Sequence, residues 1–202
     1  NALLRIDHLI YDYMLSWQRY TASGQVVILA VDDASLQQLG RWPWSRHRHA
    51  TLLDRVTAAG PKAVGFDILF SEPQADDPAA DLALAAALQR NGRSVLAVAP
   101  SQPSNDGPIT EILPLPELAA AAAGLGHVDI EIDKDGLCRS FFTHAGIGAP
   151  HWPALALAML QVTGERIAGV APPVMISRMT AVMSSELRSR RSMTRAIACL
   201  IS

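Results

Sequence analysis

The sequence predicts an α/β fold in which a parallel strand–helix–strand–helix–strand core follows a long N-terminal helix and precedes an antiparallel hairpin. Three apolar runs, at residues 26–31, 63–70 and 94–99, lack the alternation of a half-exposed strand and are typical of strands buried on both faces. Two helix-like segments separate these runs and end at Gly60 and Gly92. Right-handed crossovers through these helices would make the three strands parallel.

Residues 3–20 predict an amphipathic helix ahead of the core, because apolar side chains recur at three- and four-residue spacing. The residues of this apolar face are Leu3, Ile6, Ile10, Tyr13, Met14 and Trp17. The face could dock on the domain, belong to a helix that continues out of a membrane, or pack against a second copy of the chain. Residues 21–24 break the pattern as a loop.

A short helix and a stiff loop are predicted after the first strand. Asp33 or Ser35 could cap the helix, and Gly40 would end it. The loop 41–46 reads Arg-Trp-Pro-Trp-Ser-Arg, and Pro43 restricts its own backbone and that of the preceding residue. The loop therefore holds two indoles and two guanidinium groups in a restricted arrangement.

The rest of the domain predicts more helices and the hairpin. Helices, each followed within two residues by glycine, are expected at about 47–59, 79–90, 117–123 and 154–162. Residues 127–133 alternate apolar and polar side chains, and residues 137–144 run back after a turn. Asp135-Gly136 supplies the positive φ that a tight hairpin turn needs.

The two ends of the chain differ from the middle. From residue 174 the sequence is rich in Met, Ser and Arg and has no clear period, so we interpret 174–202 as a loosely ordered or foreign tail whose basic charge could attract anionic lipid or a partner. Residues 1–25 are the N-terminal helix with a tag remnant, and 26–173 form the domain. The start at Asn1, without Met, is typical of a cleaved expression tag and predicts a longer parent protein.

Composition excludes several classes of protein. The chain has 202 residues, 50% of them hydrophobic, which suffices for one core without disulfide or metal support. The net charge of −2 gives no electrostatic case for nucleic-acid binding. No apolar run reaches the roughly 18 residues of a membrane-spanning helix. Cys138 and Cys199 form neither a disulfide framework nor a metal-ligand spacing, although they could pair.

Three carboxylates suggest a metal-dependent hydrolase. Asp32 and Asp33 end the first predicted strand and Asp67 lies in the second, so adjacent strands would bring them together at one edge of the sheet. The donors that could complete a shell for a divalent ion are His47, His49, Asp76 and Asp77. These residues lack diagnostic ligand spacing, and no motif such as HExxH or GxSxG is present. We therefore assign no catalytic residue, metal ligand or cofactor.

The same region could bind a small ligand without turnover, or it could be structural. A ligand could stack on the indoles and pair with the charged groups. The candidate ligand-binding residues are Asp32, Asp33, Trp42, Trp44, Arg46 and Asp67. In the structural interpretation, the indoles plug the end of the sheet and the carboxylates cap helices or pair with neighbouring arginines.

Several phrases occur in a fixed order along the chain. Residues 26–77 contain an apolar strand with an acidic pair, Ser-Leu, Gly-x-Trp-Pro-Trp-x-Arg, a helix ending in Ala-Gly, and Val-Gly-Phe-Asp-Ile-Leu-Phe-Ser-Glu-Pro. Residues 126–139 contain Gly-His-Val and Asp-x-Asp-Gly-x-x-Arg, and residues 10–18 contain a Tyr-Asp helix. From about Leu3 to Gly164, this order resembles the CHASE2 domain, an extracytoplasmic sensory domain of bacterial transmembrane receptors.

The resemblance implies a periplasmic input domain at the inner membrane, in a signal-transduction receptor such as a two-component kinase or a cyclase. It implies no catalytic residues. The expected partners are an unknown small ligand or periplasmic protein, the membrane through flanking segments, and a second copy. The family continues with a Val-Leu-Ile-Gly strand and a Pro-Gly-Val-Glu-x-His segment, and the sequence after Pro173 has neither.

Three hypotheses follow for the function. A sensor would respond to its ligand by a shift of the N-terminal helix between two arrangements, which flanking membrane helices would then transmit. A hydrolase would use the three carboxylates. A dimerisation spacer that senses nothing would depend on Met14 and Trp17 at the apolar face of the first helix.

Overall fold

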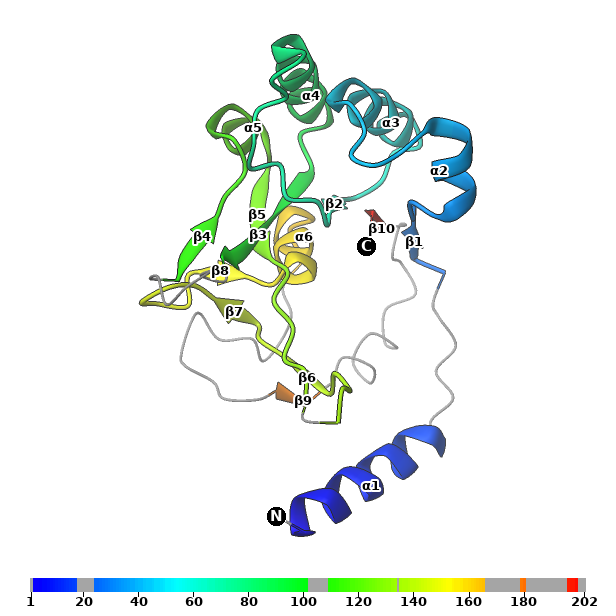
Figure 1. Cartoon of the computed structure of the whole chain (residues 1–202), viewed down its shortest axis with the longest axis vertical. Helices are drawn as coiled ribbons and strands as arrows, with labels where there is room; N and C mark the ends of the chain where they lie inside the picture. Colours follow the sequence, from blue (N-terminus) through cyan, green and yellow to red (C-terminus); the bar gives the residue numbers. More distant parts are fainter. Residues whose placement is uncertain are drawn as a thin grey trace.

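A computed structural model of the chain describes residues 2–17, 24–101, 109–133, 135–165, 179–180 and 196–199. Its helices are α1 (Ala2–Trp17), α2 (Asp33–Leu39), α3 (Arg46–Ala58), α4 (Pro78–Asn91), α5 (Pro116–Ala121) and α6 (Leu155–Val162). Its strands are β1 (Val26–Ile28), β2 (Val64–Phe66), β3 (Ser94–Ser101), β4 (Thr110–Ile112), β5 (Gly124–His127), β6 (Ser140–Phe141), β7 (His144–Ala145), β8 (Trp152–Pro153), β9 (Met179–Thr180) and β10 (Ala196–Cys199). The predicted α/β class is confirmed (Figure 1).

The main sheet runs in the order β1-β10-β2-β3, and β5 and β4 both pair with β3. The pairs of β1, β10, β2, β3 and β5 are parallel, whereas β4 is antiparallel to the end of β3. The expectation that the first two predicted strands are neighbours is wrong, because β10 lies between β1 and β2. The segment 174–202, which we interpreted as a tail, contains two strands, β9 at residues 179–180 and β10 at residues 196–199.

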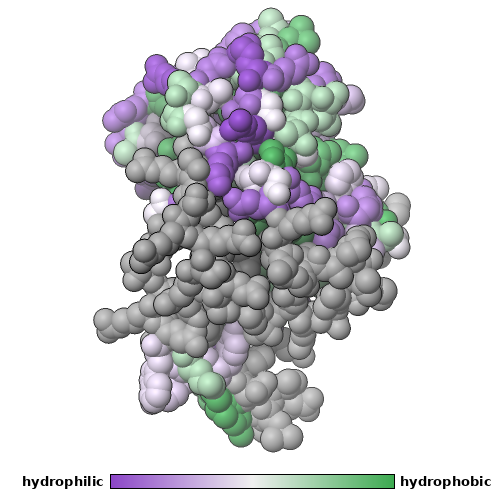
Figure 2. All heavy atoms as spheres, turned by 180° about the vertical axis from the view of Figure 1, so that it is seen from behind, coloured by the Kyte–Doolittle hydropathy of each residue, from purple (hydrophilic) through white to green (hydrophobic). Residues whose placement is uncertain are grey.

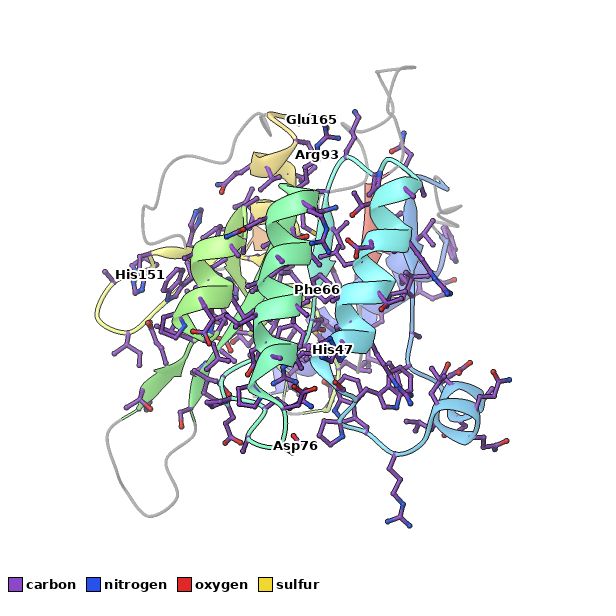
Figure 3. The ribbon with its side chains drawn as sticks, turned by 90° about the horizontal axis from the view of Figure 1, so that it is seen from above. His47, Phe66, Asp76, Arg93, His151 and Glu165 are labelled. Carbon is purple, nitrogen blue, oxygen red and sulfur yellow. The ribbon has the colours of Figure 1, made fainter. Side chains whose placement is uncertain are left out.

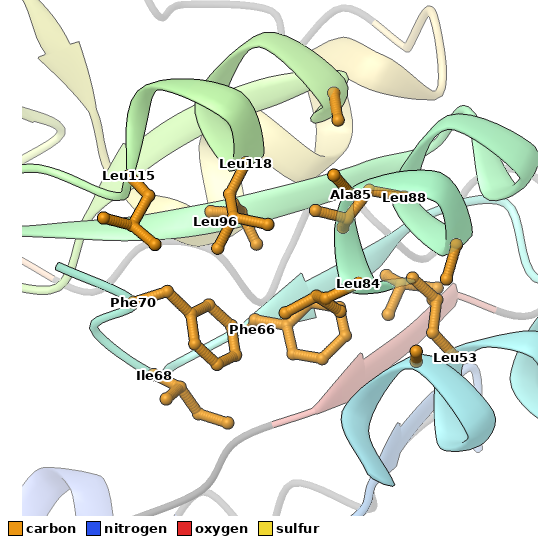
Figure 4. Packing of buried hydrophobic residues seen from close by; sticks show 14 residues of the cluster. Leu53, Phe66, Ile68, Phe70, Leu84, Ala85, Leu88, Leu96, Leu115 and Leu118 are labelled. Atoms are coloured by element: carbon orange, nitrogen blue, oxygen red, sulfur yellow. The ribbon is translucent and has the colours of Figure 1, made fainter. Parts of the chain in front are cut away.

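The core has two parts, one on each face of the sheet. Successive side chains of a strand point to opposite faces. Leu96 accordingly packs with α3, α4 and α5, and Val95 packs with α6. Figure 4 shows Phe66 and Phe70 in the larger part, where their ring centroids lie 5.9 Å apart. Figure 3 shows α3, α4 and α5 side by side over the sheet, with Phe66 beneath them.

The prediction that the first strand is buried on both faces is wrong. Val26 is 58% exposed, Val27 39% and Ile28 59%, whereas all three residues of β2 are buried. β1 is exposed because it lies outside the core. The larger core cluster is formed by residues of α3, α4, α5, β2 and β3 and includes no residue of β1. An apolar run that predicts a buried strand here forms a short edge strand instead.

Local capping explains where the helices near the Trp-Pro-Trp loop begin. The cap of α2 is Asp32, not Asp33 or Ser35 as predicted, because Asp32 has the extended backbone of a cap and its carboxylate accepts from the Ser35 backbone N–H at 2.8 Å. Ser45 caps α3, because its side-chain oxygen accepts from the backbone N–H of His47 at 3.3 Å.

The predicted hairpin forms only near its turn. The N–H of Asp133 donates to the carbonyl of Leu137 at 2.9 Å, and Gly136 has φ +82°. Beyond this turn the ladder is a single antiparallel bridge between Glu131 and Ser140. His127, the first residue of the alternating run, is also the last residue of β5 and pairs with Val98 in the parallel sheet.

The N-terminal helix forms as predicted, but its apolar face does not dock on the domain. The exposed apolar residues of α1 are Ile6, Leu9, Ile10, Tyr13, Met14 and Trp17. Figure 2 shows strongly hydrophobic side chains of this region at the lower end of the molecule. Within the described ranges, no helix is both long enough and apolar enough to cross a membrane.

Candidate ligand-binding site and its connection to the N-terminal helix

The three predicted carboxylates lie in different environments. Asp32 is occupied as the cap of α2, and hydrogen bonds from the Ser35 hydroxyl and backbone N–H hold the pKa of Asp32 below its ordinary value. Asp33 is exposed in the first turn of the same helix. Asp67 follows β2 and is half-buried, and burial raises the pKa of its carboxyl group. Because β10 lies between β1 and β2, the strands that precede these carboxylates are not neighbours in the sheet.

The hydrolase hypothesis has no support in this arrangement. Within the part of the chain that the structure describes, no three His, Cys, Asp or Glu side chains come close enough to hold a metal ion. His47 instead lies 3.2 Å from the carboxylate of Asp77, and His49 is enclosed by aromatic rings. Of the donors that the sequence placed in one shell, His47 and Asp77 therefore pair with each other, whereas His49 packs between rings.

Arg46 belongs to a buried network that fixes the loop after β2. Its guanidinium group lies 4.7 Å from the Phe70 ring centroid and 3.5 Å from the Asp81 carboxylate, and it donates to the carbonyl of Glu72 at 3.1 Å. The backbone N–H of Arg46 donates to the side-chain oxygen of Gln74. The backbone N–H of Gln74 in turn donates to the Asp81 carboxylate at 2.8 Å. The Arg46 side chain is only 13% exposed. These contacts tie α3, α4 and the loop together, so this residue is held in place by the fold.

A row of rings continues from this network to the surface. The His49 ring lies between Phe70 and Trp42, with centroid distances of 5.4 Å and 5.5 Å, and Trp42 lies 5.7 Å from Trp44. His49 is 1% exposed. Burial, assisted by the charge of Arg46, lowers the pKa of His49 to about 4, so its ring is neutral near pH 7. Its Nε2 atom is buried and makes no hydrogen bond to the described residues.

A cavity of about 720 Å³ lies between the end of β1, α2 and α3. This volume is within the range of roughly 300–1,000 Å³ that is typical of small-molecule sites. Among the six predicted ligand-binding residues, Trp44 lines the cavity. Its indole N–H donates to the carbonyl of Gly40 at 2.8 Å, so the ring is held at the cavity wall. His49 also lines the cavity, so the cavity adjoins the row of rings.

Arg139 connects the domain to α1. Its guanidinium group donates two hydrogen bonds to Asp12, from Nε at 2.9 Å and from Nη2 at 2.7 Å, in the two-pronged geometry that arginine favours with carboxylates. The same group binds Asp133 and Asp135, at 2.9 Å and 2.8 Å. The Arg139 side chain is 11% exposed. The turn thus gathers two of the three carboxylates, and α1 supplies the third.

The charges in this cluster favour its ionised state. Hydrogen bonds from Arg139 lower the pKa of Asp135 to about 2, and the surrounding carboxylates raise the pKa of Arg139 above its ordinary value. One guanidinium group faces three carboxylates, so the cluster carries a net charge of −2 when all four groups are ionised.

Asp12 and Arg139 have no role that follows from the sequence alone. The spacing Asp133-x-Asp135-Gly-x-x-Arg139 could have indicated part of the cluster, because a tight turn brings residues of this spacing together. Asp12 could not be found in this way, since it lies 127 positions from Arg139. The only local indication of a role for Asp12 was its position off the apolar face of α1.

Comparison with known proteins identifies one family. The model of the CHASE2 domain matches residues 1–197, which is nearly the whole chain and includes α1 and the main sheet apart from the last two residues of β10. No curated protein and no solved structure matches the chain.

Proposed function

The chain belongs to the CHASE2 family of extracytoplasmic sensory domains, and we propose that it is the input domain of a bacterial membrane receptor. In this proposal the domain lies on the periplasmic side of the inner membrane and binds a small ligand or a periplasmic partner. It passes the signal through α1 to flanking membrane helices. The output domain, a kinase or a cyclase, belongs to the parent receptor.

The observation that supports this route is the contact between Arg139 and Asp12. The turn at 133–139 begins six residues after the end of β5 in the main sheet, so a displacement of the sheet reaches Arg139 along a short stretch of chain. Arg139 contacts α1 by donating two hydrogen bonds to Asp12. The apolar face of α1 is exposed, so this polar contact is a defined point of attachment between α1 and the domain.

The mechanism is a shift between two populations of the receptor. In one state Asp12 is bound to Arg139, and in the other α1 is released or re-oriented. A ligand changes the ratio of the two states by the difference between its affinities for them. Coupling of this kind typically changes an equilibrium by about 5- to 150-fold. Because Asp12 is 39% exposed, we expect the lower end of that range.

The test is receptor output in membranes that carry the full-length receptor. Replacing Asp12 by Asn removes the charge that Arg139 holds, and we expect basal output to change by about fivefold. The matched control is Asp54→Asn, which removes one carboxylate from an exposed pair with Arg90 on α3 and α4 and should leave output unchanged. If both variants retain wild-type output, and deleting the domain also has no effect, the proposed input function is wrong.

A further inference from the structure

We propose that the cavity between β1, α2 and α3 binds an organic anion with an apolar body. This inference rests on the proposed sensory function, because it names the chemical class of ligand that the input domain would recognise. The cavity holds both kinds of group that such a ligand needs: apolar walls, and arginines with no carboxylate among the described lining residues.

Apolar side chains line the cavity from the β1 side and from α2 and α3. Ile28, Leu29 and Val31 line it from the end of β1 and the segment beyond, and Leu39 and Leu52 line it from the two helices. Ile28 is 59% exposed and Leu39 is 47% exposed. A bound apolar group would cover this surface, and the removal of apolar surface from water would favour binding.

The charged side of the cavity is one stripe of α3. Arg48, Thr51, Leu52 and Arg55 all line it, at the three- and four-residue spacing of a helical face. The two arginines are two helical turns apart, which is roughly 10 Å along the axis. No Asp or Glu is among the residues described at the cavity wall, so the lining favours a negatively charged ligand.

The two arginines have different roles. Arg48 is already oriented, because it donates to the carbonyl of Leu39 and lies 5.9 Å from the Trp44 ring centroid. Arg55 is exposed and makes no ion pair within the described ranges, so its guanidinium group is free to bind an anion. The hydroxyl of Thr51 donates to the carbonyl of His47, which leaves its oxygen as an acceptor.

His49 adds a polar group that lacks a partner. It lines the cavity, is 1% exposed and leaves Nε2 without a hydrogen bond to any described residue. An unpaired buried polar atom is costly, and a ligand that displaces the groups covering Nε2 would remove that cost. Because the ring is neutral near pH 7, His49 would contribute a hydrogen bond rather than a charge.

The experiment uses four aliphatic probes of equal chain length: octanoate, octyl phosphate, octylammonium and octanol. Calorimetric titration of the 202-residue chain gives each affinity, with every probe kept below its aggregation concentration. We expect both anions to bind at least about tenfold more tightly than octylammonium and octanol, since charge-assisted hydrogen bonds exceed neutral ones. The tighter of the two anions distinguishes a carboxylate head from a phosphate head.

Two variants locate the binding. Arg55→Ala should weaken octanoate binding by about tenfold. Ala30→Trp should abolish it, because Ala30 is an exposed residue of the cavity wall where a large ring fills the space without entering the core. The matched control is Arg41→Ala, which changes the charge equally at an exposed position outside the lining and should bind octanoate as the wild type does.

Several results would overturn the inference. It fails if no probe binds, if octanol or octylammonium binds as tightly as octanoate, or if Arg55→Ala and Ala30→Trp, folded by circular dichroism, keep wild-type affinity. It also fails if sedimentation shows a dimer that only Ala30→Trp dissociates, because a second copy then covers the cavity. Failure of these titrations leaves the Asp12→Asn output test intact, so the two proposals fail separately.

Discussion

Replacing Gly126 by Ala tests how closely α6 is packed against the sheet. Gly126 lies in β5 opposite Ala97 of β3. A Cβ atom at this position would lie 2.6 Å from the Cα of Leu155, 3.0 Å from its backbone N and 3.2 Å from the Cβ of Ala158. Two of these atoms are backbone atoms of α6, so the helix itself has to move to make room.

The magnitude follows from two opposing effects. Overpacking that shifts the backbone costs about 1–3 kcal/mol. Replacing Gly by Ala at an ordinary φ contributes about 0.4–1 kcal/mol of stability, by restricting the unfolded chain. The backbone at Gly126 has no positive φ, so this gain applies there too. We therefore expect Gly126→Ala to lower the free energy of unfolding by roughly 1–2 kcal/mol.

The matched control lies two residues earlier in the same strand. At Gly124 the nearest atoms to an added Cβ are in Val162 and Val95, at 3.8 Å and 3.9 Å, which is ordinary van der Waals contact. Gly124→Ala should therefore be neutral or stabilising by up to about 1 kcal/mol. Urea unfolding followed by far-ultraviolet circular dichroism gives both values, with the m-value unchanged. If the two variants shift the midpoint equally, α6 does not pack on β5 as described.

Two further predictions concern the histidine in the row of rings and the apolar face of α1. Because the folded state holds the pKa of His49 near 4 while the unfolded state protonates near its ordinary value of 6.5, the free energy of unfolding falls as pH falls through this window. The free energy of unfolding should fall by roughly 2 kcal/mol between about pH 7 and about pH 5. Urea unfolding of His49→Phe should show a smaller dependence of that free energy on pH than the wild type. An equal pH dependence in the two proteins would contradict the lowered pKa of His49. If the exposed face of α1 packs against a second copy, Met14→Gln with Trp17→Gln should convert a dimer to a monomer in sedimentation velocity. A wild-type monomer would rule out that interface.

Elements with strong local signals could be predicted from the sequence. The helices α3, α4, α5 and α6 follow from their Gly and Pro boundaries, and β2 and β3 follow from apolar runs that are buried in the structure. In each case the residues that specify the element are neighbours in the chain. Gly126, part of the Gly-His-Val phrase, now has a physical reason, because α6 approaches the backbone there.

The features that depend on distant residues could not be predicted. The apolar run of β1 is equally consistent with a buried and an edge strand, and only the position of β10 and the helices decides between them. The insertion of β10 also means that the strands before Asp32 and Asp67 are not neighbours, as the hydrolase hypothesis assumed. The cavity depends on how α2 and α3 face the end of β1, which no local period encodes.

The central claim is that Arg139 attaches α1 to the sensory domain through Asp12, and amide hydrogen exchange in α1 measures that attachment directly. In the wild-type chain, the amides around Asp12 should exchange more slowly than in Asp12→Asn, because the two hydrogen bonds to Arg139 restrict opening of the helix. Asp54→Asn should exchange at the wild-type rate in α1. Equal exchange in α1 for all three proteins would show that Asp12 and Arg139 do not hold the helix to the domain.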